Sequence, residues 1–167
     1  MKLVEGTVTV GGERFPDTGA FVDALATVGD EYGVTTQAFD ARYVVSERHL
    51  QRAVELADRE RARGNAIARE RAVEILLYAA GRRQIDRALA MGVGDGETPV
   101  VVLVDGDAES AASEAVADLL SPAATLGEYD PARVRSYFAI SEQELAATDA
   151  DLADLVLERV ALLVVER

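Results

Sequence analysis

The order of hydrophobic and polar positions in the first part of the chain predicts two strands and a helix. Lys2–Val10 alternates between polar and apolar residues and is followed by two glycines, which is typical of a strand and its turn. Asp17–Tyr32 carries apolar residues near helical spacing and predicts a helix. Thr35–Val45 alternates again and predicts a second strand.

Two further predicted strands are apolar on both faces, as expected of central strands. They are Arg71–Ala80 and Pro99–Asp105. Helical patterns separate the strands. One helix begins after the candidate N-cap Ser46, a second covers Gln84–Met91, and a third covers Asp107–Leu120.

Beyond residue 120 the pattern is helical, because Asp130-Pro131 and the pair Ser141 and Glu144 are signals for the start of a helix. The predicted fold is α/β, with a central sheet of about four strands covered by helices and a helical C-terminal part. The chain has 167 residues and shows no repeat or linker, so residues 1–167 are predicted to form a single domain.

Composition narrows the classes of function. The chain is 49% hydrophobic and has no cysteine, which excludes disulfide bonds, thiol catalysis and zinc–thiolate sites. No apolar segment approaches the ~20 residues that span a bilayer, and the first residues have the pattern of a strand rather than of a signal peptide. We therefore expect a cytoplasmic location and no membrane partner.

Charge is distributed unevenly along the chain. There are 30 acidic and 17 basic residues, and every basic residue except Lys2 is an arginine, which indicates a protein from a salt-loving organism. Residues 1–41 carry a net charge of −5 and residues 88–167 a net charge of −12. Residues 42–87 contain 11 arginines against 7 acids and reach +4. A phosphate backbone would dock on this middle segment rather than elsewhere on the chain.

Three candidate sites have simpler structural explanations. His49 has no cysteine or second histidine with which to hold a metal or form a catalytic pair, and we expect it on a helix surface. The glycines of Gly92–Glu97 follow a helix and precede a strand, the reverse of the order in a nucleotide-binding loop. Asp105–Glu109 lacks the further ligands of a calcium loop and fits the start of a helix. No catalytic residue, metal or cofactor is predicted.

Two arginine-rich stretches are candidates for binding nucleic acid. Arg59–Arg71 contains five arginines, which either pair with local glutamates or form a guanidinium-rich edge for phosphates. After Gly81, the residues Arg82, Arg83 and Gln84 fall at the start of a predicted helix, whose N-terminus would attract an anion; a solvated turn is the alternative. The two stretches flank one predicted strand and would meet only if the first folds back beyond its end.

The last predicted helix carries two apolar stripes. The first consists of Leu152, Leu155, Val156, Val160 and Leu163. The second consists of Leu157, Ala161, Leu162 and Val165. A helix that is apolar on nearly all sides must be covered on more than one side. Either the helix is buried in the core of the chain, or one stripe stays exposed for a protein partner.

Three segments of the chain resemble a known family. They are "NAIARERAVEILLYAAGRRQIDRALAMGVGDG", the downstream "VVVLVDG" and the terminal "LERVALL". Together they are similar to the small subunit of the KEOPS complex, in the family of the human PRPK-binding protein TPRKB (the CGI family). The similarity covers most of the chain and is most specific from about Asn65 to Gly106. The lysine-poor, acid-rich composition resembles that of haloarchaeal proteins.

This resemblance implies a role in the threonylcarbamoyladenosine modification of tRNA. Members of the family are non-catalytic; they bind the kinase or ATPase subunit, and through it the threonylcarbamoyl transferase subunit, and they help to recruit tRNA by its single-stranded 3′ end. The residues that the resemblance assigns to RNA are Asn65, Arg82, Arg83, Gln84 and Ile85. Those assigned to the kinase subunit are Leu152, Leu155, Val156, Val160 and Leu163.

Two other functions stay open. The chain could be a small-molecule-binding α/β domain or enzyme that holds a phosphorylated metabolite at the Gly81 turn, although no acid is paired with a histidine or lysine in a recognisable motif. It could also be a scaffold that binds protein and no RNA.

Overall fold

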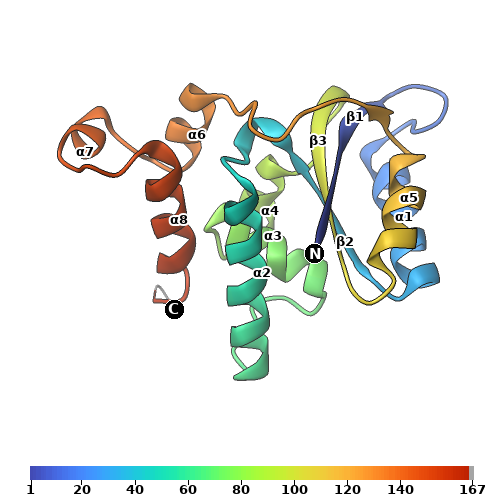
Figure 1. The fold of residues 1–167 in the computed structure, drawn as a ribbon, viewed down its shortest axis with the longest axis horizontal. Helices are drawn as coiled ribbons and strands as arrows, with labels where there is room; N and C mark the ends of the chain where they lie inside the picture. The colour runs from blue at the N-terminus through green and yellow to red at the C-terminus, as the bar shows by residue number, and fades with distance from the viewer. Residues whose placement is uncertain (166–167) are drawn as a thin grey trace. The chain divides into compact units, whose positions relative to one another are not determined.

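The computed structural model describes residues 1–165, and their contacts divide the chain into two compact units. The sheet unit consists of Met1–Ala41 and Ala90–Leu126. The helical unit consists of Arg42–Leu89 and the segment from Gly127 onward. Figure 1 shows the elements of both units. That residues 1–167 act as one domain stays a prediction.

The sheet unit is built on an antiparallel sheet, which has four strands within the described residues. The strands are β1 (Lys2–Val10), β2 (Thr35–Asp40), β3 (Gly96–Asp105) and β4 (Ser121–Pro122), in the order β2-β3-β1-β4. β1 pairs with β3 along its whole length, from Lys2 opposite Val104 to Val10 opposite Gly96. β4 pairs only with Gly6 and Thr7 of β1. A Cβ atom at Gly6 would lie 2.6 Å from the Ser121 carbonyl oxygen, so only glycine permits this close approach.

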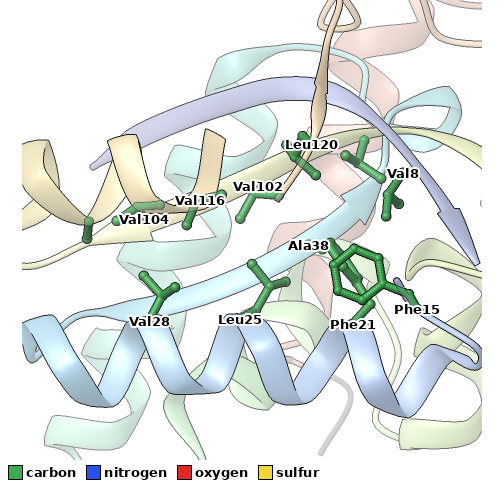
Figure 2. Close-up of a cluster of buried hydrophobic side chains, with 12 residues drawn as sticks. Val8, Phe15, Phe21, Leu25, Val28, Ala38, Val102, Val104, Val116 and Leu120 are labelled. Atoms are coloured by element: carbon green, nitrogen blue, oxygen red, sulfur yellow. The ribbon is translucent and has the colours of Figure 1, made fainter. Parts of the chain in front are cut away.

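Two helices pack on one face of this sheet and enclose a hydrophobic core. They are α1 (Thr18–Tyr32) and α5 (Glu109–Ala117). Alternate residues of β3 face them, because side chains of a strand point to opposite faces in turn. Figure 2 shows how the core side chains converge between the helices and the strands. The core consists of Val8, Phe15, Phe21, Leu25, Val28, Ala38, Val100, Val102, Val104, Ala112, Val116 and Leu120.

The helical unit is built around a hairpin of two helices with the last helix packed against both. The hairpin is α2 (Glu47–Ala62) and α3 (Arg71–Ala80), and the last helix is α8 (Leu152–Leu162). The shorter helices are α4 (Ile85–Ala88), α6 (Pro131–Tyr137) and α7 (Glu142–Ala146). Two 3-10 segments, Ala41–Tyr43 and Leu89–Met91, lie where the chain passes from one unit to the other. The Ser46 and Asp130 side chains cap α2 and α6, as their positions in the sequence predict.

The structure confirms a mixed α/β fold with a four-stranded sheet and a helical C-terminal part, but it corrects two of the predicted strands. The strand predicted at Thr35–Val45 ends at Asp40, and Ala41–Tyr43 forms a 3-10 segment. Arg71–Ala80 is the helix α3, not a central strand. Every residue of α3 from Glu74 to Ala80 is buried, and the run Ile75–Ala80 is apolar on all sides, as expected of a buried helix. The fourth strand is instead β4, which is too short to leave a pattern in the sequence.

Candidate functional site

Two buried carboxylates organise the loop that joins α2 to α3. The Glu74 side chain has no exposed surface, and its oxygens accept hydrogen bonds from the backbone N–H groups of Ile67 (2.9 and 3.0 Å) and Ala68 (3.4 Å). Glu60, also fully buried, lies 3.3 Å from the Arg63 guanidinium. Because buried carboxylates are stable only when they are hydrogen-bonded or paired, these contacts fix the shape of the loop.

Most arginines of the stretch 59–71 are paired with neighbouring acids. Arg59 and Arg63 contact Glu60, and Arg61 lies 3.9 Å from Glu74. Arg71 binds Asp58 through two hydrogen bonds of 2.8 Å. Of the two alternatives for this stretch, local pairing describes these four residues. Arg69 is exposed, and within residues 1–165 its guanidinium has no hydrogen bond or ion pair.

The Gly81 turn ends α3 with its backbone groups satisfied. Gly81 has φ 62° and ψ 32°, a left-handed conformation that favours glycine. The Gly81 N–H donates to the Tyr78 carbonyl (3.1 Å), and the Arg82 N–H donates to the Leu77 carbonyl (3.0 Å). This pair of bonds is the Schellman motif. Because both N–H groups are already bonded, neither is free to hold a phosphate.

Arg82 faces the protein rather than solvent. Its guanidinium donates a hydrogen bond to the Tyr137 carbonyl and lies over the Tyr137 ring, with the guanidinium carbon 4.7 Å from the ring centroid. The Tyr137 hydroxyl donates in turn to the Arg87 carbonyl (2.8 Å). Arg82 is therefore engaged within the helical unit.

The next three residues, Arg83, Gln84 and Ile85, are defined here as the exposed tip: Gln84 and Ile85 are exposed, and Arg83 is half-buried. Within the described chain, the Arg83 guanidinium makes no hydrogen bond or ion pair, and Gln84 makes no side-chain cap to α4. Ile85 is 49% exposed although it is apolar. The tip thus offers a planar cation, an amide and an apolar side chain to solvent.

The structure does not bring Asn65 to the exposed tip. Asn65 precedes the first turn of α3 and the tip follows its last turn, so the ten-residue helix, about 15 Å long, lies between them in the chain. α4 has only four residues, so it adds little dipole at Gln84. The structure places together Arg83, Gln84 and Ile85. Arg82 is adjacent to them but its side chain contacts Tyr137, and Asn65 lies at the other end of α3.

The structure separates the two apolar stripes of the last helix. Leu155, Val156, Val160 and Leu163 of the first stripe are buried and Leu152 is half-buried; α8 packs on α2 and α3. This stripe forms part of the core of the helical unit. The second stripe is open at its end: Leu162 is 38% and Val165 is 77% exposed. We call Leu157, Ala161, Leu162 and Val165 the open stripe.

His49 is buried, not on a helix surface as expected, because it completes the hydrogen bonding of two neighbouring backbone groups. Its Nε2 lies 2.8 Å from the Ala79 carbonyl oxygen and its Nδ1 accepts from the Val45 N–H (3.4 Å). The ring is therefore neutral, with the proton on Nε2. Burial lowers the pKa of His49 to about 4. With both nitrogens engaged inside the unit, His49 has a structural role.

Sequence reasoning missed Tyr137 and Glu74, which hold the two candidate loops. Tyr137 lies fifty residues beyond Arg87 in the sequence, and no motif relates them. Glu74 had a detectable signal: a lone acid within an apolar run needs a buried partner. Among residues 1–165, no group of acidic or histidine side chains could hold a metal ion, and no helix is long and apolar enough to cross a membrane.

In a comparison with protein families, the model described as "Kinase binding protein CGI-121" matches residues 23–163. No curated protein matches the chain. The matched residues include parts of both units, and with them the α2–α3 loop, the exposed tip and α8.

Proposed function

The chain belongs to the CGI-121 family of kinase-binding proteins, and on that basis we propose that it is a non-catalytic subunit of the KEOPS complex. It binds the kinase or ATPase subunit and, through it, the threonylcarbamoyl transferase subunit. It also recruits tRNA by its single-stranded 3′ end, in the cytoplasm. Because the family match includes parts of both units, we propose that they serve as one small-subunit domain.

The exposed tip is the observation that carries the proposed RNA contact. An unpaired 3′ end presents base faces and edges, which proteins bind by stacking and hydrogen bonds. Arg83 supplies a planar face and forked donors, Gln84 an amide for base edges, and Ile85 an apolar contact. Few arginines of the helical unit are as free to bind, because most of those between residues 59 and 71 are paired.

Asn65 is proposed as a separate, second contact. The ten-residue helix α3, about 15 Å long, lies between Asn65 and the tip, so we propose that the two contact different nucleotides. Its backbone N–H donates to the Glu60 carbonyl (2.8 Å), which fixes its position in the loop that Glu74 organises. If RNA reaches both places, it must run along α3.

The proposed kinase contact is the open stripe of α8. In this conformation the buried stripe is already covered by α2 and α3, whereas Leu162 and Val165 present apolar surface to solvent. Docking of an apolar helix face into a groove of a partner protein is a common mode of association. The family implies that this partner is a kinase. The metabolite alternative at the Gly81 turn loses support, because the turn's N–H groups are bonded internally.

The decisive experiment replaces Arg83 by Glu and measures tRNA affinity. We expect Arg83→Glu to weaken binding about tenfold or more, since a cation is replaced by a charge that repels phosphate. Arg14→Glu is the matched control: it makes the same change of charge on an exposed arginine of the sheet unit, which belongs to neither of the two proposed RNA contacts. Removing the 3′ nucleotides from the tRNA should weaken wild-type binding and leave the Arg83→Glu protein little affected.

Equal affinity of wild type and Arg83→Glu would remove the RNA role of the tip. Equal losses in Arg83→Glu and Arg14→Glu would show that general charge, rather than this tip, attracts tRNA. Thermal stabilisation by sugar phosphates or nucleotides, without any binding of tRNA, would favour a metabolite-binding domain.

A further inference from the structure

Tyr137 holds both ends of the segment that carries the exposed tip. At the start of the segment, the Arg82 guanidinium binds the Tyr137 carbonyl and stacks on the Tyr137 ring at 4.7 Å. At its end, the Arg87 carbonyl accepts the Tyr137 hydroxyl at 2.8 Å. Between these two anchors lie Arg83, Gln84 and Ile85. One aromatic side chain from α6 thus closes the loop formed by residues 82–87.

The environment of Tyr137 restricts the movement of the side chain that holds both ends of this segment. Its ring makes edge-to-face contacts with Tyr43 (5.3 Å) and Phe138 (5.1 Å), so the ring is held from other sides. Burial raises the pKa of Tyr137, which keeps its hydroxyl protonated as a donor to Arg87. A guanidinium over a partly buried ring is worth more than one in free solution, because little water competes.

The residues of the segment itself show why it needs contacts from Tyr137 to stay ordered. α4 is a single turn with no side-chain N-cap, and isolated turns of helix are unstable in water. Ile85 and Leu89, at 49% and 57% exposure, give the segment little burial of its own. The order of the tip therefore depends on contacts from outside the segment, and Tyr137 supplies them at both ends.

We infer that Tyr137 is a positioning residue for the RNA-facing tip, and that Arg82 acts through Tyr137 instead of contacting RNA. The inference rests on the proposed function, because it assigns roles within the same RNA contact. It assigns different roles to the two consecutive arginines: Arg83 contacts RNA, and Arg82 fixes the direction in which Arg83 points. A tip held in advance loses less conformational freedom on binding, which raises affinity without any new contact.

The test compares three variants for tRNA affinity at several salt concentrations. Arg82→Lys keeps the charge but loses the planar fork and the stacking, so we expect a loss of about tenfold. Tyr137→Leu should lose a similar factor, and Tyr137→Phe a smaller one, about threefold to fivefold, since only the bond to Arg87 is removed. In all three variants the slope of log affinity against log salt should stay that of wild type, because no phosphate contact is lost.

A local measurement separates positioning from loss of the fold. Amide hydrogen exchange in residues 83–88 should accelerate in Tyr137→Leu and Tyr137→Phe, while exchange in α1 and α5 of the sheet unit should stay unchanged. Tyr137→Phe changes a single hydroxyl and keeps the ring, so it keeps the test valid if Tyr137→Leu does not fold.

The outcomes distinguish this inference from the proposed function. Wild-type affinity in Arg82→Lys would overturn the inference, because the charge of residue 82 alone would then be sufficient. Two further variants, Arg82→Ala and Arg83→Ala, are compared for their salt dependence: equally shallow slopes of log affinity against log salt would make Arg82 a phosphate contact and also overturn the inference. Loss of binding in Arg83→Glu with wild-type binding in both Tyr137 variants would overturn only the inference. Wild-type binding in Arg83→Glu would overturn the proposed function itself.

Discussion

His49 shows how one buried side chain links stability to pH. Its Nδ1 accepts from the Val45 N–H, so a proton on Nδ1 would place two donors against each other. Its pKa is lowered from 6.5 to about 4 by burial, while in the unfolded chain the ordinary value returns. The unfolded chain therefore binds the proton more readily between pH 6.5 and 4, and folding stability must fall as the pH falls through that window.

We predict that the His49 contribution to stability is complete above pH 6.5 and decreases by about 3 kcal/mol as the pH approaches 4, at about 1.4 kcal/mol for each unit of pKa shift. Denaturant unfolding at a series of pH values measures it. His49→Gln is the control, since it keeps a polar side chain without the titration; its stability should be lower at pH 7 but less dependent on pH. Parallel pH profiles for the two proteins would contradict the prediction.

At the residue scale, sequence reasoning found the side chains of the tip but not their partners. The run Arg82, Arg83, Gln84 and Ile85 stands out in the sequence because it follows an apolar segment and a glycine. Which of the two arginines is free could not be predicted, because Arg82 meets Tyr137 across fifty-five residues of chain. The local acids that pair with Arg59–Arg71 were visible, but whether each pair forms depends on side-chain direction.

At the element scale, the strand predicted at Arg71–Ala80 was wrong because Ile75–Ala80 is apolar at every position, and such a run has no periodicity that separates a buried strand from a buried helix. Two features of the segment favour a helix: its alanines and leucines are strong helix formers, and Glu74 and Arg71 are tolerated at the first turn. The strands β1 and β3 were predictable, since alternation and a β-branched run mark them. The consequence for the site is that Asn65 and the tip lie at opposite ends of a helix.

The two stripes of α8 should respond differently to the same substitution. Val160 is fully buried, so Val160→Asp places an unpaired charge in the core and should unfold the helical unit, at a cost above about 4 kcal/mol. Leu162→Asp with Val165→Asp, on the open stripe, should leave the melting temperature nearly unchanged and abolish capture of the KEOPS kinase subunit in a pull-down.

Val22→Asp provides the matched control for the open stripe, because Val22 is 53% exposed on α1 of the sheet unit. It should retain the kinase subunit. Retention of the kinase by the Leu162→Asp, Val165→Asp protein would move the kinase contact elsewhere. A stably folded Val160→Asp protein would contradict the assignment of the buried stripe to the core.

At the scale of the whole molecule, the net charge of −13 opposes compaction. Salt reduces this repulsion, since the screening length falls from about 30 Å at 0.01 M to about 3 Å at 1 M. We predict that the melting temperature rises as sodium chloride is increased, with most of the rise at low concentration, where screening changes fastest. Thermal unfolding followed by circular dichroism measures it. A melting temperature independent of salt, or a rise that begins only above about 1 M, would contradict this account.

The placement of α8 has a consequence for how the protein is made. Its buried stripe covers α2 and α3, yet about 70 residues of chain, including residues 90–126 of the sheet unit, are synthesised between α3 and α8. At about 5–20 residues per second, a ribosome needs about 4–14 seconds to cover that interval. During that time the apolar hairpin emerges without its cover, so nascent chains stalled before residue 152 should be the species that chaperones retain.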